Sequence, residues 1–188
     1  MKIAKLIIEN YILMFSDPQK NLEQFGLAPG SRVADLGSGA GFYTFPAAKM
    51  AGPRGRVYAI DISKDMLTKI KHAADQSGLA NIEALWGNVE KLGGTRLADA
   101  SVDAALACNT LFQLEEKKDF PFEVKRILKP RGRLLVVDWK ESFGGMGPQA
   151  EDVVSAEAAR TLFEKAGFTF EREIPAGEHH YGIIFRRV

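Results

Sequence analysis

The sequence predicts an α/β fold in which a doubly wound, mostly parallel sheet carries helices on both faces. Short apolar segments, typical of buried strands, alternate along the chain with segments of helical period. The segment 102–108 is apolar almost throughout, as expected for a strand that is covered on both faces. The last two apolar segments, 168–174 and 181–188, leave no room for a crossover helix between them. They are therefore expected to pair as an antiparallel hairpin.

The composition suits one domain over residues 1–188. Of these residues 46% are hydrophobic and 26% are charged, which is ordinary for a globular protein that needs no metal or disulfide. The formal net charge of +1 gives no global field that would attract nucleic acid. Cys108 is the only cysteine, which excludes an internal disulfide and a multi-cysteine zinc site and favours a cytoplasmic location.

A local cluster of basic residues occurs near the middle of the chain. It falls on the end of a predicted helix and on the turn after it, where cations interact favourably with the helix dipole. We expect these side chains to form a solvated helix cap rather than a nucleic-acid site. The cluster consists of Lys125, Arg126, Lys129, Arg131 and Arg133.

Residues 1–28 are expected to form an N-terminal helical segment that packs on the core or covers the ligand. The apolar run in its first half is too short to span a bilayer, so no membrane span is predicted, and a peripheral membrane contact is the alternative. A helix is expected to begin with Asp17 as its N-cap and Pro18 in its first turn, and to end at the Pro-Gly pair at 29–30.

Turn and capping signals set the bounds of the remaining elements. Ser63 is a predicted N-cap, while Gly78, Pro130 and Gly167 follow expected helix ends. Between these signals we expect strands at 32–36, 56–60, 82–86, 102–108 and 134–139, and helices at 42–50, 64–77, 115–128 and 155–166.

The strongest functional signal is VADLGSGAG at Val33–Gly41, where a predicted strand runs through a glycine-rich turn into a helix. Glycines let a ligand lie against bare main chain, and the helix N-terminus offers unpaired N–H groups. Dinucleotide enzymes space these glycines as G-x-G-x-x-G/A, whereas here they are Gly37, Gly39 and Gly41. Asp35 precedes them, and a carboxylate there suits a ligand with an ammonium group. The alternative is a merely tight turn.

Asp61 ends the second predicted strand, 20 residues after Gly41. An acid at this place can accept hydrogen bonds from both hydroxyls of a ribose. The alternative role, an N-cap for the next helix, is already filled by Ser63. We therefore expect a ligand that contains adenosine with a free ribose.

Asn88 follows the third predicted strand, whose carboxyl end should line the same crevice. Its side-chain oxygen is expected to accept a hydrogen bond from the adenine amino group, with Ile62 and Val89 on either side of the ring. A turn-forming asparagine is the alternative.

Together these segments resemble the class I S-adenosylmethionine-dependent methyltransferases, in particular the small-molecule group that includes the quinone-biosynthesis enzymes. The resemblance covers residues 22–188 and rests on VADLGSGAGFYT, VYAIDIS, GNVEKL, SVDAALACNTLFQLEE and ILKPRGRLLVVDW. It implies a Rossmann-like seven-stranded sheet of order 3-2-1-4-5-7-6 with the last strand antiparallel, and S-adenosyl-L-methionine as cofactor. The cofactor-binding residues that it implies, together with the adenine-site residues above, are Asp35, Gly37, Ser38, Gly39, Gly41, Asp61, Ile62, Asn88, Val89 and Cys108.

Three positions bear on the chemistry. Asn88 stands where the family often has aspartate, and both side chains offer an oxygen acceptor. Relatives often carry histidines where this chain has Phe112 and Gln113, so no catalytic residue is assigned. Cys108 has a second interpretation as a small buried hydrophobe, and a single cysteine cannot support arsenic-type trithiol chemistry.

We therefore expect an enzyme that transfers a methyl group by in-line displacement to a small, partly apolar acceptor. Alignment of the two reactants is then the main task of the protein. His179 and His180 are expected to be solvated turn residues, and the glycine-rich loop 141–151 is expected to be a mobile lid. The side chains expected to line the acceptor pocket are Tyr11, Phe15, Phe42 and Tyr43.

Two alternatives belong to other functional classes. A non-catalytic module would bind S-adenosylmethionine without turnover, since a fold and a cofactor pocket do not prove a reaction. A nicotinamide-dependent reductase is disfavoured by the glycine spacing. No metal site is predicted.

Overall fold

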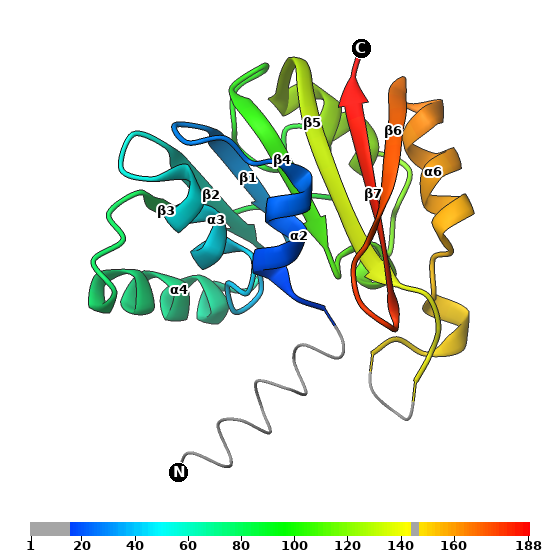
Figure 1. The fold of residues 1–188 in the computed structure, drawn as a ribbon, viewed down its shortest axis with the longest axis horizontal. Coiled ribbons are helices and arrows are strands. Elements are labelled where there is room, and N and C mark those ends of the chain that lie inside the picture. The colour runs from blue at the N-terminus through cyan, green and yellow to red at the C-terminus, as the bar shows by residue number, and fades with distance from the viewer. Residues whose placement is uncertain (1–15, 144–146) are drawn as a thin grey trace.

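The computed structural model describes residues 16–143 and 147–188, and its centre is a seven-stranded sheet of order β3-β2-β1-β4-β5-β7-β6 (Figure 1). The strands β1 to β5 pair in parallel, and β7 pairs antiparallel with both β5 and β6. The predicted fold class and strand order are confirmed. The strands are β1 (Arg32–Leu36), β2 (Arg56–Asp61), β3 (Ile82–Trp86), β4 (Val102–Cys108), β5 (Leu128–Trp139), β6 (Phe168–Pro175) and β7 (His180–Arg187).

Side-chain N-caps hold the starts of three helices, and two of them, Asp17 and Ser63, were predicted. Asp17, Ser63 and Ser155 each accept a hydrogen bond from a backbone N–H three residues further on, which satisfies a donor that the helix itself leaves unpaired. The α-helices are α2 (Pro18–Phe25), α3 (Thr44–Ala51), α4 (Lys64–Gln76), α5 (Phe120–Ile127) and α6 (Ala156–Lys165), and the 3₁₀ turns are η1 (Leu111–Gln113) and η2 (Ala150–Asp152).

Alternation along the strands divides the core into two layers. In β5 the side chains of Leu135 and Val137 face the layer that contains α2 and α3, whereas Leu134 and Val136 face the layer that contains α5 and α6. Figure 1 shows α2 and α3 in front of the sheet. Because both faces are covered, the central strands are apolar on both sides.

Two helices differ in length from the prediction. The helix expected to run to the Pro-Gly pair at 29–30 ends at Phe25, because Gly26 adopts a left-handed conformation with φ of 71° and its N–H closes the last turn. The helix expected from residue 115 begins only at Phe120. The backbone N–H groups of Glu115 and Glu116 bond the Glu90 carboxylate instead, which holds these residues outside the helix.

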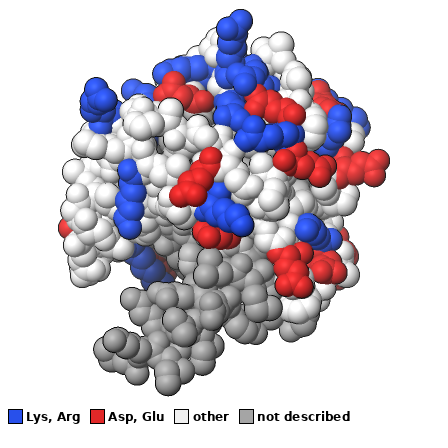
Figure 2. Space-filling model, in the orientation of Figure 1, with Lys and Arg blue, Asp and Glu red and all other residues white. Residues whose placement is uncertain are grey.

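The expectation of a solvated helix cap holds in part: Lys125 and Arg126 lie in the last turn of α5, but three of the five residues form ion pairs. Arg126 bonds Glu123 and Asp99, and Lys129 bonds Asp103. Arg133 likewise pairs with Glu171. The face in Figure 2 accordingly shows basic and acidic side chains interspersed over its described part.

Within the described ranges, no helix is long and apolar enough to cross a membrane. The helix expected in the first half of residues 1–28 lies outside the described residues. The second half of that segment contains α2, and Leu22, Phe25 and Leu27 pack into the front layer of the core.

Candidate functional site

A hollow of about 180 Å³ lies at the carboxyl ends of β1, β2 and β3. This is the edge at which open α/β sheets bind ligands. Six of the ten predicted cofactor-binding residues meet there. The lining residues are Gly37, Gly39, Asp61, Ile62, Gly87, Asn88, Val89, Glu90, Thr110, Gln113 and Leu114.

The glycine turn between β1 and α3 is fixed by its backbone. The N–H groups of Gly37 and Ser38 donate to the carbonyl of Ile60 at 2.9 and 3.0 Å, which ties the turn to β2. Gly41 has φ of 87°, and a Cβ there would lie 2.6 Å from the Phe45 ring. At Gly39 a Cβ would meet no atom within 4 Å, so bare main chain borders the hollow.

Asp61 joins the two turns that border the hollow. One carboxylate oxygen accepts from the Gly39 N–H at 2.8 Å, and the other accepts from the Ser63 N–H at 2.8 Å. The side chain is only partly buried and lines the hollow. A carboxylate therefore stands at the end of β2 and borders the hollow, and each of its oxygens accepts one backbone N–H.

Asp35 is buried at 2% exposure and does not line the hollow. Its Oδ2 accepts a 2.5 Å hydrogen bond from the Thr44 hydroxyl. Burial raises the pKa of Asp35 to about 6; the Thr44 bond opposes this rise and the charge of Asp61 adds to it. The carboxyl is therefore mainly ionised at neutral pH and protonated in moderately acidic solution.

The side of the hollow predicted to hold adenine combines an exposed and a buried apolar residue. Ile62 is 62% exposed at the rim, whereas Val89 is 7% exposed. The Asn88 side-chain oxygen accepts from the Glu90 N–H at 2.9 Å, which is the turn-forming geometry of the alternative interpretation. A carbonyl oxygen has two lone pairs, so this bond leaves one for a ligand.

Five lining residues were absent from the predicted cofactor set: Gly87, Glu90, Thr110, Gln113 and Leu114. Thr110 donates to the carbonyl of Leu36 at 2.8 Å, which packs the start of η1 against the glycine turn. Glu90 holds the backbone of residues 115 and 116. The segments after β3 and β4 therefore close over one another, and no local sequence signal indicates these contacts.

Ser38, Gly41 and Cys108 were predicted for the site but do not line the hollow. The Ser38 hydroxyl is buried and has no hydrogen-bond partner among the described residues. Cys108 is buried in the front layer of the core. Burial raises the pKa of its thiol well above the usual value, and the charge of Asp35 adds to this, so Cys108 stays protonated.

The expected acceptor residues divide into an exposed and a buried one. Phe42 is 63% exposed directly after the glycine turn. Tyr43 is buried, and its hydroxyl is hydrogen-bonded to Asn21 at 2.9 Å and to Ser16 at 3.0 Å. Tyr11 and Phe15 lie outside the described residues.

The histidines of the β6–β7 turn are buried, so the expectation of solvated residues is wrong. His179 Nδ1 lies 2.9 Å from a Glu141 carboxylate oxygen, and its ring stacks on Phe143. His180 is 1% exposed, with its ring centroid 4.3 Å from that of Trp139. The turn folds against the loop that follows β5, and this tertiary contact removes both rings from water.

The lid predicted at 141–151 is described except for residues 144–146. At Gly147 a Cβ would lie 2.8 Å from the Trp139 ring, so the second half of the loop packs closely against the end of β5. Glu141 is fixed to His179. Both described flanks of the loop are therefore attached to the sheet edge.

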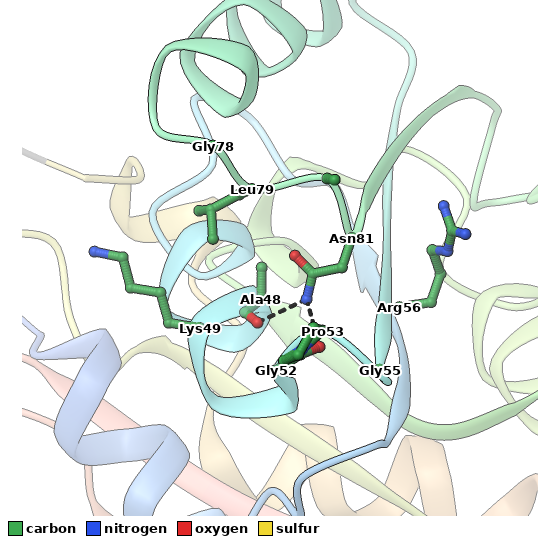
Figure 3. A pocket seen from close by; sticks show the side chains of 10 residues that line it. Ala48, Lys49, Gly52, Pro53, Gly55, Arg56, Gly78, Leu79 and Asn81 are labelled. Carbon is green, nitrogen blue, oxygen red and sulfur yellow. Dashed lines mark hydrogen bonds between the residues drawn. The ribbon is translucent and has the colours of Figure 1, made fainter.

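A second hollow, of about 450 Å³, lies at the opposite edge of the sheet and contains none of the predicted site residues (Figure 3). The Asn81 side chain donates to the carbonyls of Ala48 and Gly52 at 2.8 and 3.0 Å. These carbonyls belong to the last turn of α3 and the residue after it, and each also accepts a backbone N–H, from Gly52 and Gly55 respectively. Asn81 thus stabilises the end of a helix.

Replacing Asn81 by alanine should lower the free energy of unfolding by about 1–3 kcal/mol, because two hydrogen bonds are lost, each worth about 0.5–1.5 kcal/mol, although each carbonyl keeps a backbone donor. Urea unfolding of the wild type and of Asn81→Ala measures the difference. Ala80→Gly, at the neighbouring exposed position, is a suitable control for local backbone change. If Asn81→Ala unfolds at the same urea concentration as the wild type, water replaces the side-chain amide without loss of stability.

Comparison with known proteins decides the family. The family model described as "Methyltransferase domain" matches residues 27–171. The chain belongs to this methyltransferase family. A solved S-adenosylmethionine-dependent methyltransferase from Aquifex aeolicus superposes with a TM-score of 0.86 and 35% sequence identity, over 94% of this chain and 93% of that one.

Curated relatives of this methyltransferase-family chain differ in their acceptors. An arsenite methyltransferase from Halobacterium salinarum is 35% identical over 60% of this chain and 28% of its own length. A ubiquinone/menaquinone biosynthesis C-methyltransferase from Hahella chejuensis is 30% identical over 73% of this chain and 54% of its own length. The chain thus spans only part of these two relatives.

Proposed function

We propose that this chain is an S-adenosylmethionine-dependent methyltransferase acting on a small, partly apolar acceptor. The observation that carries the proposal is the position of Asp61, which lines the hollow and binds the backbone of the glycine turn. A carboxylate and exposed main-chain groups beside an apolar slot match the ribose, methionine and adenine parts of this cofactor.

The residues present fit such a ligand. The hollow presents bare backbone at Gly39, where even a Cβ would have free space. The buried hydroxyl of Ser38 has no partner among the described residues and would gain one from a carboxylate ligand. Asp61 would hold the ribose, Ile62 and Val89 the adenine, and Asp35 the ammonium group.

When bound, S-adenosylmethionine supplies a methyl group that its sulfonium has already activated. The task that remains for the protein is to orient the acceptor and to exclude water, and well-oriented proximity can supply roughly 7–11 kcal/mol of a barrier. Asp138 is fully buried, and its carboxylate accepts from the N–H groups of Leu111 and Trp139. It fixes the end of β5 against η1, whose Gln113 lines the hollow.

The chemistry of Cys108 favours an acceptor other than arsenite. Cys108 is the only thiol of the chain, and burial keeps it protonated. Thiolate is the form that binds soft metal and metalloid ions, and one buried thiol cannot form a multi-thiol site. A small organic acceptor of the kind that quinone-biosynthesis relatives methylate is therefore the better match.

Calorimetric titration of the purified protein with S-adenosylhomocysteine, and separately with NADH, tests the cofactor. We expect a saturable isotherm at one site for the first ligand and none for the second. Binding of NADH alone would overturn the proposal in favour of a reductase. Release of S-adenosylhomocysteine from S-adenosylmethionine in the presence of phenolic or quinol acceptors then separates an enzyme from a binding module.

A further inference from the structure

The buried pair Thr44–Asp35 connects α3 to β1 beside the glycine turn. Thr44 is fully buried, and its hydroxyl donates to Oδ2 of Asp35 at 2.5 Å. Within residues 16–143 and 147–188 no other hydrogen bond reaches this carboxylate. One oxygen of Asp35 is thus held by the protein, and the other retains its acceptor capacity.

We propose that Thr44 is a positioning residue for the cofactor, whose hydroxyl orients the Asp35 carboxylate so that its second oxygen receives the ammonium group of the methionine part. This inference rests on the proposed function. It adds a residue of α3 that has no place among the predicted site residues and that does not line the hollow. Thr44 acts on the ligand only through Asp35.

The physical need for such a residue follows from the burial of Asp35. Burial raises the pKa of this carboxyl to about 6, the bond from Thr44 opposes the rise, and the charge of Asp61 adds to it. Cys108 and Tyr43 are the other titratable groups on this side, and burial raises the pKa of each, so both stay neutral. Thr44 is thus the one described neighbour whose hydrogen bond favours the carboxylate.

The hydrogen bond from the Thr44 hydroxyl also fixes the orientation of the Asp35 carboxylate. An isolated carboxylate on a short side chain can rotate about its last bond, whereas a bond to Oδ2 from a fully buried helix residue leaves one orientation. Orientation matters because charge-assisted hydrogen bonds to an ammonium group depend on geometry as well as on charge. The pair therefore presents an ionised and oriented acceptor.

A purely structural role for Thr44 makes a different prediction about ligands. Loss of packing would disturb the whole glycine turn and weaken all adenosine ligands alike. Loss of Asp35 orientation would weaken only ligands that carry an amino group. S-adenosylhomocysteine carries this group, and 5′-methylthioadenosine shares its adenosine and thioether but lacks it.

The test compares Thr44→Val, which keeps the shape of the side chain without the hydroxyl, with Thr44→Ser, which keeps the hydroxyl. At neutral pH we expect Thr44→Val to bind S-adenosylhomocysteine about tenfold or more weakly, the usual effect of a lost bond to a charged group. Its affinity for 5′-methylthioadenosine should stay at the wild-type value. Thr44→Ser should bind both ligands as the wild type does.

The pH profile supplies a readout that packing alone would not move. Wild-type affinity for S-adenosylhomocysteine should rise with pH through about 6 and then level off, because ionised Asp35 accepts the ammonium group. In Thr44→Val the midpoint should move to higher pH. The titration of Asp35 can also be followed without ligand, from the ¹³C chemical shift of its carboxyl carbon. In Thr44→Val the pH midpoint of this titration should likewise lie at higher pH.

Two outcomes would count against the inference and can be told apart. If Thr44→Val weakens both ligands equally, or leaves the carboxyl midpoint unchanged, Thr44 has only a packing role and the proposed function stands. If the wild type binds neither ligand, the proposed function fails and the positioning role fails with it.

Discussion

Replacing Asp61 by alanine is expected to weaken the binding of S-adenosylhomocysteine by about a hundredfold or more. Two hydrogen bonds from ribose hydroxyls to a carboxylate are lost, and each bond to a charged group is worth about 1.5–3 kcal/mol. The bond from the Gly39 N–H is lost as well, so the glycine turn keeps only its bonds to the Ile60 carbonyl as ties to β2. Calorimetry on Asp61→Ala measures the change.

The matched control is Asp65→Ala, which removes an exposed carboxylate from the first turn of α4 without touching the hollow. Its affinity should equal that of the wild type. Asp61→Asn should fall between the two, because it keeps one oxygen acceptor but carries no charge. Unchanged affinity in Asp61→Ala would remove Asp61 from the ribose site and with it the main support for the proposed cofactor.

The second large effect is expected at Glu123, whose side chain has no exposed surface. Its carboxylate accepts from the N–H of Gly93 at 2.7 Å and from the N–H and hydroxyl of Thr95 at 3.1 and 2.6 Å. Arg126 adds two bonds of 2.8 Å. Glu123→Ala should therefore lower the free energy of unfolding by about 3–5 kcal/mol, because the donors of Gly93 and Thr95 lose their partner and the partly exposed Arg126 is left with its ion pair to Asp99.

Chemical unfolding of Glu123→Ala measures this effect, with Glu116→Ala, an exposed position just before α5, as the control that should stay within about 0.5 kcal/mol of the wild type. Burial alone would raise the pKa of Glu123, but the bonds from Arg126 and Thr95 outweigh it and lower the pKa. The contribution of the ionised group is therefore present above the usual glutamate pKa and is lost as the pH falls below it. If the difference in unfolding free energy between the wild type and Glu123→Ala does not decrease in acid, the ionised carboxylate is not the source of the stability.

Most strands and the starts of α2, α4 and α6 could be predicted because their signals are local. The glycine turn follows an apolar strand, and Ser63 and Ser155 stand at the helix starts that they cap. Residues close in sequence make these structures, so the sequence displays them directly. The convergence of Asp61 and Asn88 at one edge follows equally from the direction of parallel strands.

The errors arise where a partner distant in sequence decides the outcome. The Glu90 carboxylate accepts a hydrogen bond from the N–H of Glu115, which is 25 residues further along the chain. This contact keeps Glu115 out of α5. His179 is buried because it contacts two residues of the loop after β5: its ring nitrogen lies near the Glu141 carboxylate, and its ring stacks on Phe143. The contribution of Thr44 to the site shares this property, since only the folded chain shows which group its hydroxyl bonds.

The position of β7 has a consequence for the biosynthesis of the protein. This strand is the last in chain order, yet it lies between β5 and β6 and pairs with both. While a ribosome has delivered only the residues before 180, the edge of β5 exposes unpaired backbone and the apolar residues that β7 later covers. The nascent chain therefore carries an open, aggregation-prone edge until its final strand arrives, and it should depend on chaperones during that interval.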